Sequence, residues 1–172
     1  MKKILKILLI VGVLGIIIFL SYKVATKIQD KTKTENRLKT IPEFEFLTLN
    51  NSIYTHKNLS QNTAAIFIYF NSECDFCQHE AQSISDSLDE FKDVQLLFIS
   101  TEPIETIKKF SEQYNLHNQQ NITFLYDNNS YFSSRFDATT IPYILIYDKN
   151  QKLIKKHKGQ LNATGLLKAL NP

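Results

Sequence analysis

Cys74 and Cys77 are the only two cysteines in this chain of 172 residues, and two residues separate them. They follow a strand-like apolar run at 64–70 and lie where a helix-like pattern begins. A helix N-terminus offers unpaired N–H groups and partial positive charge, which favour a thiolate at the first cysteine. The second cysteine lies one turn on, within reach of a disulfide to the first. This pair at a strand-to-helix junction predicts thiol–disulfide exchange.

Other uses of a cysteine pair fit less well. A structural disulfide across two residues closes a small loop and restricts the unfolded chain little, so stability is a weak reason for it. A c-type haem site needs His directly after the second cysteine, and Gln78 stands there. A structural zinc site needs four ligands; His79 offers a third, but the chain has no second cysteine pair. We therefore expect no metal and no bound cofactor.

Apolar patterns predict alternating strands and helices around this pair. Continuous apolar runs at 64–70 and 94–100 are typical of strands buried on both faces. One helix carries an apolar stripe over four turns, at Cys77, Ala81, Ile84, Leu88 and Phe91. Further strands are expected at 44–49, 52–55, 122–126, 143–147 and 152–158, and further helices at 103–114, 130–136 and 163–170. This order predicts a three-layer α/β/α domain with a mixed central sheet and an N-terminal β-hairpin.

The charge of the chain is divided unevenly along its length. Residues 1–34 hold seven lysines and one aspartate, a net +6, whereas residues 35–172 hold 13 basic and 16 acidic residues, a net −3. A surface that binds phosphates needs clustered positive charge on the folded domain. The mildly acidic domain therefore argues against nucleic acid as a partner.

The N-terminal segment predicts a membrane anchor. From Ile7 to Tyr22 the chain carries no charge, and Lys6 and Lys23 can extend their ammonium groups toward water from the two ends. The alternative is a cleaved signal peptide, but no clear small-residue cleavage pattern follows the apolar stretch. We expect an anchor or signal segment at 1–23, a polar tether at 24–40 and a folded domain at 41–172. Lysines flank the apolar stretch on both sides, so charge asymmetry alone does not fix its orientation. Lys2, Lys3 and Lys6 fit an N-terminus in the cytoplasm and a domain outside it.

Taken together, the layout resembles the thioredoxin fold, in the membrane-tethered subgroup known as TlpA-like or redoxin-domain proteins related to AhpC/TSA. The resemblance covers residues 40–172 and is based on the Cys74–Cys77 pair after a buried strand and on Thr140-Ile141-Pro142 before another strand. Glu80 also matches, since extracytoplasmic reductases of the family often carry C-x-x-C-x-x-E. The resemblance implies that Pro142 follows a cis peptide bond and faces the cysteine pair.

Three positions depart from the family pattern. Glu73 stands where the family usually has Trp, and Gln82 where a proline often follows the glutamate. Ile68 stands near the place of the buried aspartate of thioredoxin. Because Glu73 and Asp75 bring negative charge beside Cys74 and oppose the helix dipole, we expect a reductant rather than a strong oxidant.

The predicted site combines three catalytic and three substrate-binding residues. Cys74 is expected to attack, Cys77 to resolve the mixed disulfide, and Glu80, half-buried at the edge of the apolar stripe, to exchange protons with Cys77. A solvent-exposed structural glutamate is an equally good interpretation of Glu80. The resemblance implies that the backbone of Ile141, beside Pro142, pairs with an extended client segment, and Phe76 offers an apolar rim for docking.

The sequence thus predicts an extracytoplasmic, membrane-tethered protein-disulfide oxidoreductase. Its partners would be protein disulfides and a membrane electron donor that regenerates the dithiol; by resemblance, the clients include apo-cytochrome c, and general disulfide reduction is equally open. One alternative is a thiol peroxidase, although Asn71 and Phe67 replace the Thr and Pro of the peroxiredoxin pattern. The other is a non-catalytic tethered module in which the cysteines form a structural disulfide.

Overall fold

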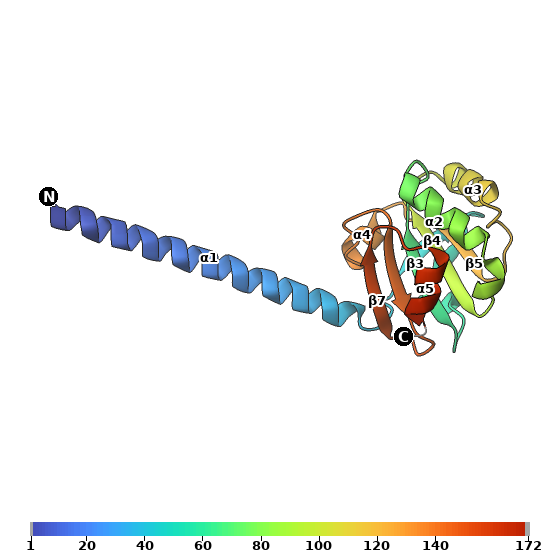
Figure 1. Cartoon of the computed structure of the whole chain (residues 1–172), viewed down its shortest axis with the longest axis horizontal. Helices are drawn as coiled ribbons and strands as arrows, with labels where there is room; N and C mark the ends of the chain where they lie inside the picture. Colours follow the sequence, from blue (N-terminus) through green and yellow to red (C-terminus); the bar gives the residue numbers. More distant parts are fainter. Residues whose placement is uncertain (1, 171–172) are drawn as a thin grey trace. The chain divides into compact units, whose positions relative to one another are not determined.

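The computed structural model describes residues 2–170, except that the side chains of residues 2–11 and 13 are left undescribed (Figure 1). The chain divides into two compact units between Arg37 and Leu38. The folded domain thus begins three residues before the expected position 41, because Leu38 is buried in the core of the second unit.

The described part of the N-terminal unit is a single helix, α1 (Lys2–Leu38), whose last residue already belongs to the second unit. Before Leu38, the described apolar side chains of this helix are exposed, among them Leu14, Ile16, Ile17, Ile18, Phe19 and Leu20. Among the residues that the structure describes, no helix is both long enough and apolar enough to cross a membrane. The predicted anchor at 1–23 includes side chains outside the described set and stays a prediction. The expected tether at 24–40 lies in the same helix as far as Leu38.

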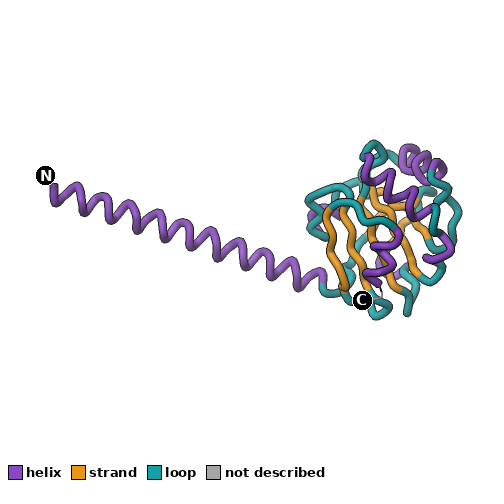
Figure 2. Tube along the Cα trace, in the orientation of Figure 1, coloured by secondary structure: helices purple, strands orange, loops and turns teal. Residues whose placement is uncertain are grey.

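The second unit is built on a seven-stranded sheet with the order β2-β1-β5-β4-β3-β6-β7 (Figures 1 and 2). Strands β3, β4 and β5 are parallel, whereas β1, β2, β6 and β7 pair in antiparallel fashion, so the sheet is mixed as expected. The strands are β1 (Glu45–Thr48), β2 (Ile53–Thr55), β3 (Ala64–Tyr69), β4 (Val94–Ser100), β5 (Ile122–Tyr126), β6 (Tyr143–Tyr147) and β7 (Leu153–Lys158).

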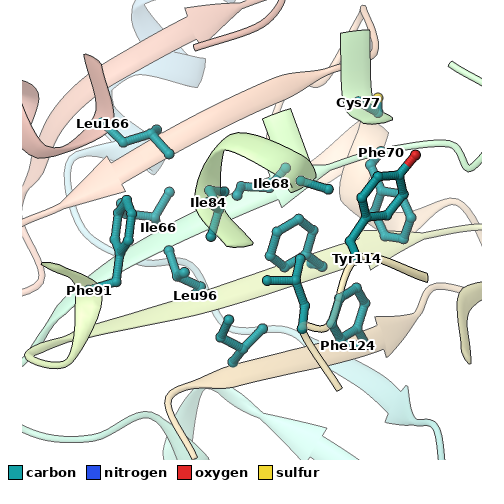
Figure 3. Close-up of a cluster of buried hydrophobic side chains, with 14 of the residues drawn as sticks. Ile66, Ile68, Phe70, Cys77, Ile84, Phe91, Leu96, Tyr114, Phe124 and Leu166 are labelled. Carbon is teal, nitrogen blue, oxygen red and sulfur yellow. The ribbon is translucent and has the colours of Figure 1, made fainter. Parts of the chain in front are cut away.

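Helices cover both faces of this sheet and explain why its central strands are continuously apolar. The helices are α2 (Asp75–Ser85), α3 (Ile104–Gln113), α4 (Tyr131–Arg135) and α5 (Ala163–Leu170), with short 3-10 turns at η1 (His56–Asn58) and η2 (Leu88–Phe91). Alternate residues of β3 enter two cores. Ile66 and Ile68 pack with side chains of α2, α3 and α5 (Figure 3), whereas Phe67 and Tyr69 pack with α4 and β1. The predicted three-layer architecture is confirmed.

The apolar stripe predicted as one long helix is divided into two elements. Helix α2 ends at Ser85, and Ser87 leaves the helical region with φ −124° and ψ 23° before η2 begins. Serine and aspartate favour local hydrogen bonds over helix continuation, and the segment 83–89 is rich in both. Phe91 still reaches the core, where it is fully buried.

Candidate active site

Cys74 lies at the N-cap of α2, at the edge of the sheet where β3 ends. Its backbone is extended, with φ −84° and ψ 114°, and its N–H donates to the Asn71 carbonyl at 3.2 Å. Its own carbonyl accepts the first helical bond, from the Gln78 N–H at 3.0 Å. The side chain is half-buried and carries a free thiol. The expected position at the helix start is confirmed.

Cys77 lies one turn further along α2 and is buried, with only 2% of its surface exposed. It belongs to the core cluster that also contains Phe70 and Ala81, and Figure 3 shows it at the edge of this cluster near Phe70. Burial raises the pKa of the Cys77 thiol far above its ordinary value. The backbone of Asn71 offsets this in part, whereas the Cys74 sulfur and the Glu80 charge raise the pKa further. At neutral pH Cys77 is therefore a protonated thiol.

Glu80 is fully buried, in contrast to the half-buried position expected from the sequence. Neither carboxylate oxygen has a hydrogen-bond partner. Burial raises the pKa of Glu80 to about 8, and the nearby backbone of Leu161 offsets this in part. The carboxyl group is thus held mostly neutral at pH 7.

The difference at Glu80 comes from an element distant in the sequence. Helix α5 and the loop before it pack beside α2, and the N–H of Ala163 donates to the Ser83 hydroxyl at 3.0 Å. Leu161, in this loop, packs against the same core cluster as Cys77. The spacing of apolar residues along α2 places Glu80 at the edge of the apolar stripe. This spacing contains no information about α5 and the loop before it, which pack beside α2.

Pro142 lies at the same edge of the sheet as the cysteine pair, and the Ile141–Pro142 bond is cis, as the resemblance implied. Tyr143 pairs with Tyr69 in the antiparallel register of β6 with β3. Pro142 is therefore opposite Phe70, four residues before Cys74. The ring is buried, and its carbonyl accepts the Gly159 N–H at 2.9 Å.

The two apolar side chains predicted for docking are exposed. Phe76, in the first turn of α2, is 61% exposed, and Ile141 is 42% exposed. Large apolar side chains usually lose contact with water on folding, so their exposure beside the cysteine pair is consistent with a surface that another chain covers. Their role in binding stays a prediction.

A group of polar residues beside the cysteines was not found by sequence reasoning. Glu102, after β4, accepts hydrogen bonds from the backbone and hydroxyl of Ser72 and from the hydroxyl of Ser100. One sequence signal was available: β3 and β4 were both predicted as buried strands, and the carboxyl ends of neighbouring parallel strands meet at one edge of a sheet. Among the described residues, no group of three or more His, Cys, Asp or Glu side chains is placed to hold a metal ion.

Comparisons with known proteins agree with this arrangement. The family described as AhpC/TSA matches residues 38–156, which include the cysteine pair and the proline loop. A search of curated proteins finds no match.

Several solved structures share the fold. A secreted Mycobacterium tuberculosis disulfide oxidoreductase homologous to E. coli DsbE is 21% identical, with a TM-score of 0.63 over 79% of this chain and 97% of its own. Peroxidoxin BcpB from Mycobacterium tuberculosis is 17% identical, with a TM-score of 0.65 over 77% and 94%. The exposed lipoprotein thioredoxin Etrx1 from Streptococcus pneumoniae is 18% identical, with a TM-score of 0.59 over 75% and 98%.

At these sequence identities the structural similarity establishes a thioredoxin-like fold only. The activity of this chain has to be argued from its own residues. The match over residues 38–156 covers more than half of the chain. The chain therefore belongs to the AhpC/TSA family of redoxins with a thioredoxin-like fold.

Proposed function

We propose that this protein is an extracytoplasmic, membrane-tethered oxidoreductase that reduces protein disulfides with its Cys74–Cys77 pair. One observation carries the proposal: a half-buried cysteine lies at the N-cap position of α2, and a buried cysteine and a buried carboxyl group follow on the same helix. An accessible first thiol can meet a client disulfide, whereas a second thiol kept inside the protein reacts with its neighbour and little else.

The reaction follows two exchange steps. The Cys74 thiolate attacks one sulfur of a client disulfide, a bond forms between Cys74 and that sulfur, and the other client sulfur leaves as a thiolate. Cys77 then loses its proton and attacks the Cys74 sulfur. The Cys74–Cys77 disulfide forms and the second client thiolate leaves, so the client gains two electrons and this protein loses two. A dithiol protein in the membrane would restore the reduced pair.

Glu80 would take up the proton in the second step. The Cys77 thiol must become a thiolate in a buried position where burial opposes the charge. Glu80 lies one turn away on α2, and its raised pKa of about 8 makes its carboxylate a stronger base than an exposed glutamate. It can therefore accept the proton as Cys77 attacks and return it when the dithiol is restored.

The client would dock beside the proline loop. The exposed side chains of Phe76 and Ile141 supply apolar contact, and the backbone of Ile141 is available to an extended segment by strand addition. The client class stays that expected from the sequence: protein disulfides, with apo-cytochrome c among them and no nucleic acid.

A redox titration tests this function against the two alternatives. The full chain, equilibrated in thiol–disulfide buffers and then alkylated, should show a midpoint near that of thioredoxin, about −270 mV. Cys74 should be alkylated much faster than Cys77, because Cys77 is buried. A pair that stays oxidised in native protein at strongly reducing potentials would indicate a structural disulfide and would refute the proposal. Turnover of peroxide by the reduced protein would favour a peroxidase instead.

A further inference from the structure

Glu102 binds the loop that carries Cys74 with short hydrogen bonds. Its Oε1 accepts from the Ser72 hydroxyl at 2.6 Å, and its Oε2 accepts from the Ser72 N–H at 2.7 Å and from the Ser100 hydroxyl at 3.1 Å. Bonds to a carboxylate are among the stronger hydrogen bonds in proteins, and two of these have the length typical of that class. Because Glu102 is half-buried, water competes with them only in part.

Ser72 is held from a second side as well. Its carbonyl accepts from the side-chain amide of Gln78 in α2 at 2.8 Å. All three polar groups of Ser72 therefore have partners, in the loop after β4 and in α2. The neighbouring Asn71 adds two local bonds: its side chain accepts from the Glu73 N–H at 2.9 Å, and its carbonyl accepts from Cys74. We call Glu102, Ser72 and Gln78 the Ser72 clamp.

We propose that Glu102 is a positioning residue for disulfide exchange: through the Ser72 clamp it holds Cys74 in place relative to Cys77 and so favours closure of the disulfide. This inference rests on the proposed redox function. Cys77 is fixed in α2 and its core cluster, whereas Cys74 ends a loop whose position depends on Ser72, two residues before it.

The physical reason lies in the narrow geometry of a disulfide. The two Cβ atoms must come to about 3.8 Å with a restricted torsion angle. A loop that holds one thiol close to the other raises its effective concentration, and this favours the intramolecular bond over open forms. Loosening the loop lowers that concentration, which destabilises the disulfide relative to the dithiol and makes the protein a weaker reductant.

Two variants test the clamp in complementary ways. Glu102→Gln keeps the shape of the side chain but removes the charge, and Ser72→Ala removes one hydrogen bond without altering Glu102. We expect Glu102→Gln to lower the equilibrium constant for disulfide formation about tenfold, which moves the midpoint about 30 mV toward less negative potentials. Ser72→Ala should shift it in the same direction by less. The double variant should shift less than the sum of the two, since both changes remove the same contact.

Glu105→Gln is the matched control. Glu105 is an exposed carboxylate in the first turn of α3, three residues after Glu102. Its replacement removes the same charge from the same part of the chain, and we expect an unchanged midpoint.

A second measurement separates positioning from structural support. The free energy of unfolding is measured for each variant in its dithiol and in its disulfide form. A positioning role destabilises the disulfide form more, by the amount that the shifted midpoint requires. Equal destabilisation of both forms, with a midpoint equal to that of Glu105→Gln, would overturn the inference while the redox function stands. A wild-type protein without a measurable dithiol–disulfide equilibrium would refute both.

Discussion

Cys77 and Glu80 are two buried acids on one helix, and each makes ionisation of the other harder. The Glu80 charge is one of the causes that raise the pKa of Cys77. Glu80, with a pKa raised to about 8, carries its charge in only about a tenth of molecules at pH 7. The pair therefore holds one negative charge far more easily than two. Transfer of the proton from Cys77 to the Glu80 carboxylate leaves the pair with one negative charge before and after, so the step brings no second charge into this buried position.

The rate of the second exchange step should depend on Glu80. In the wild type it should rise between pH 7 and 9, as the carboxylate form of Glu80 becomes the main one. Glu80→Gln should slow this step about 100-fold near pH 8, because general-base catalysis commonly contributes on that scale. Single-turnover release of a reduced client from its mixed disulfide with Cys74 measures it. Glu90→Gln, which removes an exposed carboxylate in η2 away from the cysteine pair, is the control. An unaltered pH profile in Glu80→Gln would contradict the role.

Glu80 should also make stability depend on pH. Between pH 4.5 and about 8 the folded protein keeps a proton on Glu80 that the unfolded chain has released, so stability falls as the pH rises. The full effect is roughly 5 kcal/mol, and it is absent below pH 4.5, where both states are protonated. Relative to the wild type, Glu80→Gln should therefore gain several kcal/mol from pH 5 to pH 8, as measured by urea unfolding of the dithiol form. Parallel pH curves for the two proteins would show that Glu80 is ionised when folded.

The exposed side chains of Phe76 and Ile141 should contribute to the binding of protein substrates and not to that of small ones. Replacing Phe76 and Ile141 together by Ala should raise KM for a protein disulfide about tenfold, since burial of an apolar side chain contributes about 1.5–3 kcal/mol at most. Turnover of a small disulfide reagent should not change. Ile53→Ala is a matched control, because Ile53 is also 61% exposed but lies on the edge strand β2. Equal losses with both substrates would point to a disturbed site instead of lost docking.

For single residues, the sequence predicted the role of those side chains whose role depends on their spacing along the chain. Cys74 and Cys77 are recognisable because only two residues separate them and both lie within the first turn of a predicted helix. The full burial of Glu80 could not be predicted from local spacing, since the backbone of Leu161, which lies beside its carboxyl group, belongs to a distant part of the chain. Glu102 was missed for the same reason: its partner Ser72 lies 30 residues earlier.

Local sequence patterns predicted the helices and strands more accurately than they predicted the arrangement of the candidate active site. The central strands were predicted almost to the residue because helices on both sides make them continuously apolar. The apolar stripe from Cys77 to Phe91 was wrongly predicted to be one helix. A 3-10 turn can continue an apolar face after the helix ends at Ser85. Apolar spacing records which side chains face the core, and a change of helix type leaves it nearly intact.

A single glycine shows how closely α5 packs against the loop over Glu80. A Cβ atom at Gly165 would come within 2.6 Å of the Leu161 side chain. Gly165→Ala should therefore displace Leu161 and destabilise the protein by about 1 kcal/mol, even though Ala favours a helix by a similar amount. Thermal unfolding measures this. Thr164→Ala, at an exposed position in the same helix, should instead leave stability unchanged or slightly raise it; a stabilising Gly165→Ala would show that Leu161 moves without cost.

At the scale of the whole molecule, the two units have opposite character. The segment 1–34 carries a net charge of +6, and its described large apolar side chains are exposed, whereas residues 35–172 carry −3 and bury most of theirs. An exposed run of large apolar residues in water is costly, so it indicates contact with lipid or protein. A membrane tether would supply that contact and would hold the cysteine pair near a membrane donor.

Fractionation of cells that express the full chain tests the tether and its orientation together. The 16 uncharged residues from Ile7 to Tyr22 are just short of a typical span, and Lys6 and Lys23 can extend to the two interfaces. The protein should therefore stay with the membrane after an alkaline wash, and a membrane-impermeant maleimide should label Cys74 in intact cells.

A chain that begins at Leu38 is the control and should appear in the soluble fraction. The mass of the recovered full chain distinguishes a retained anchor from a cleaved signal peptide, since cleavage would remove the whole apolar stretch. Labelling only after lysis would place the domain inside the cell and would contradict the proposed orientation. Because a cytoplasmic compartment keeps thiols reduced, that result would also direct the search for clients away from proteins with stable disulfides.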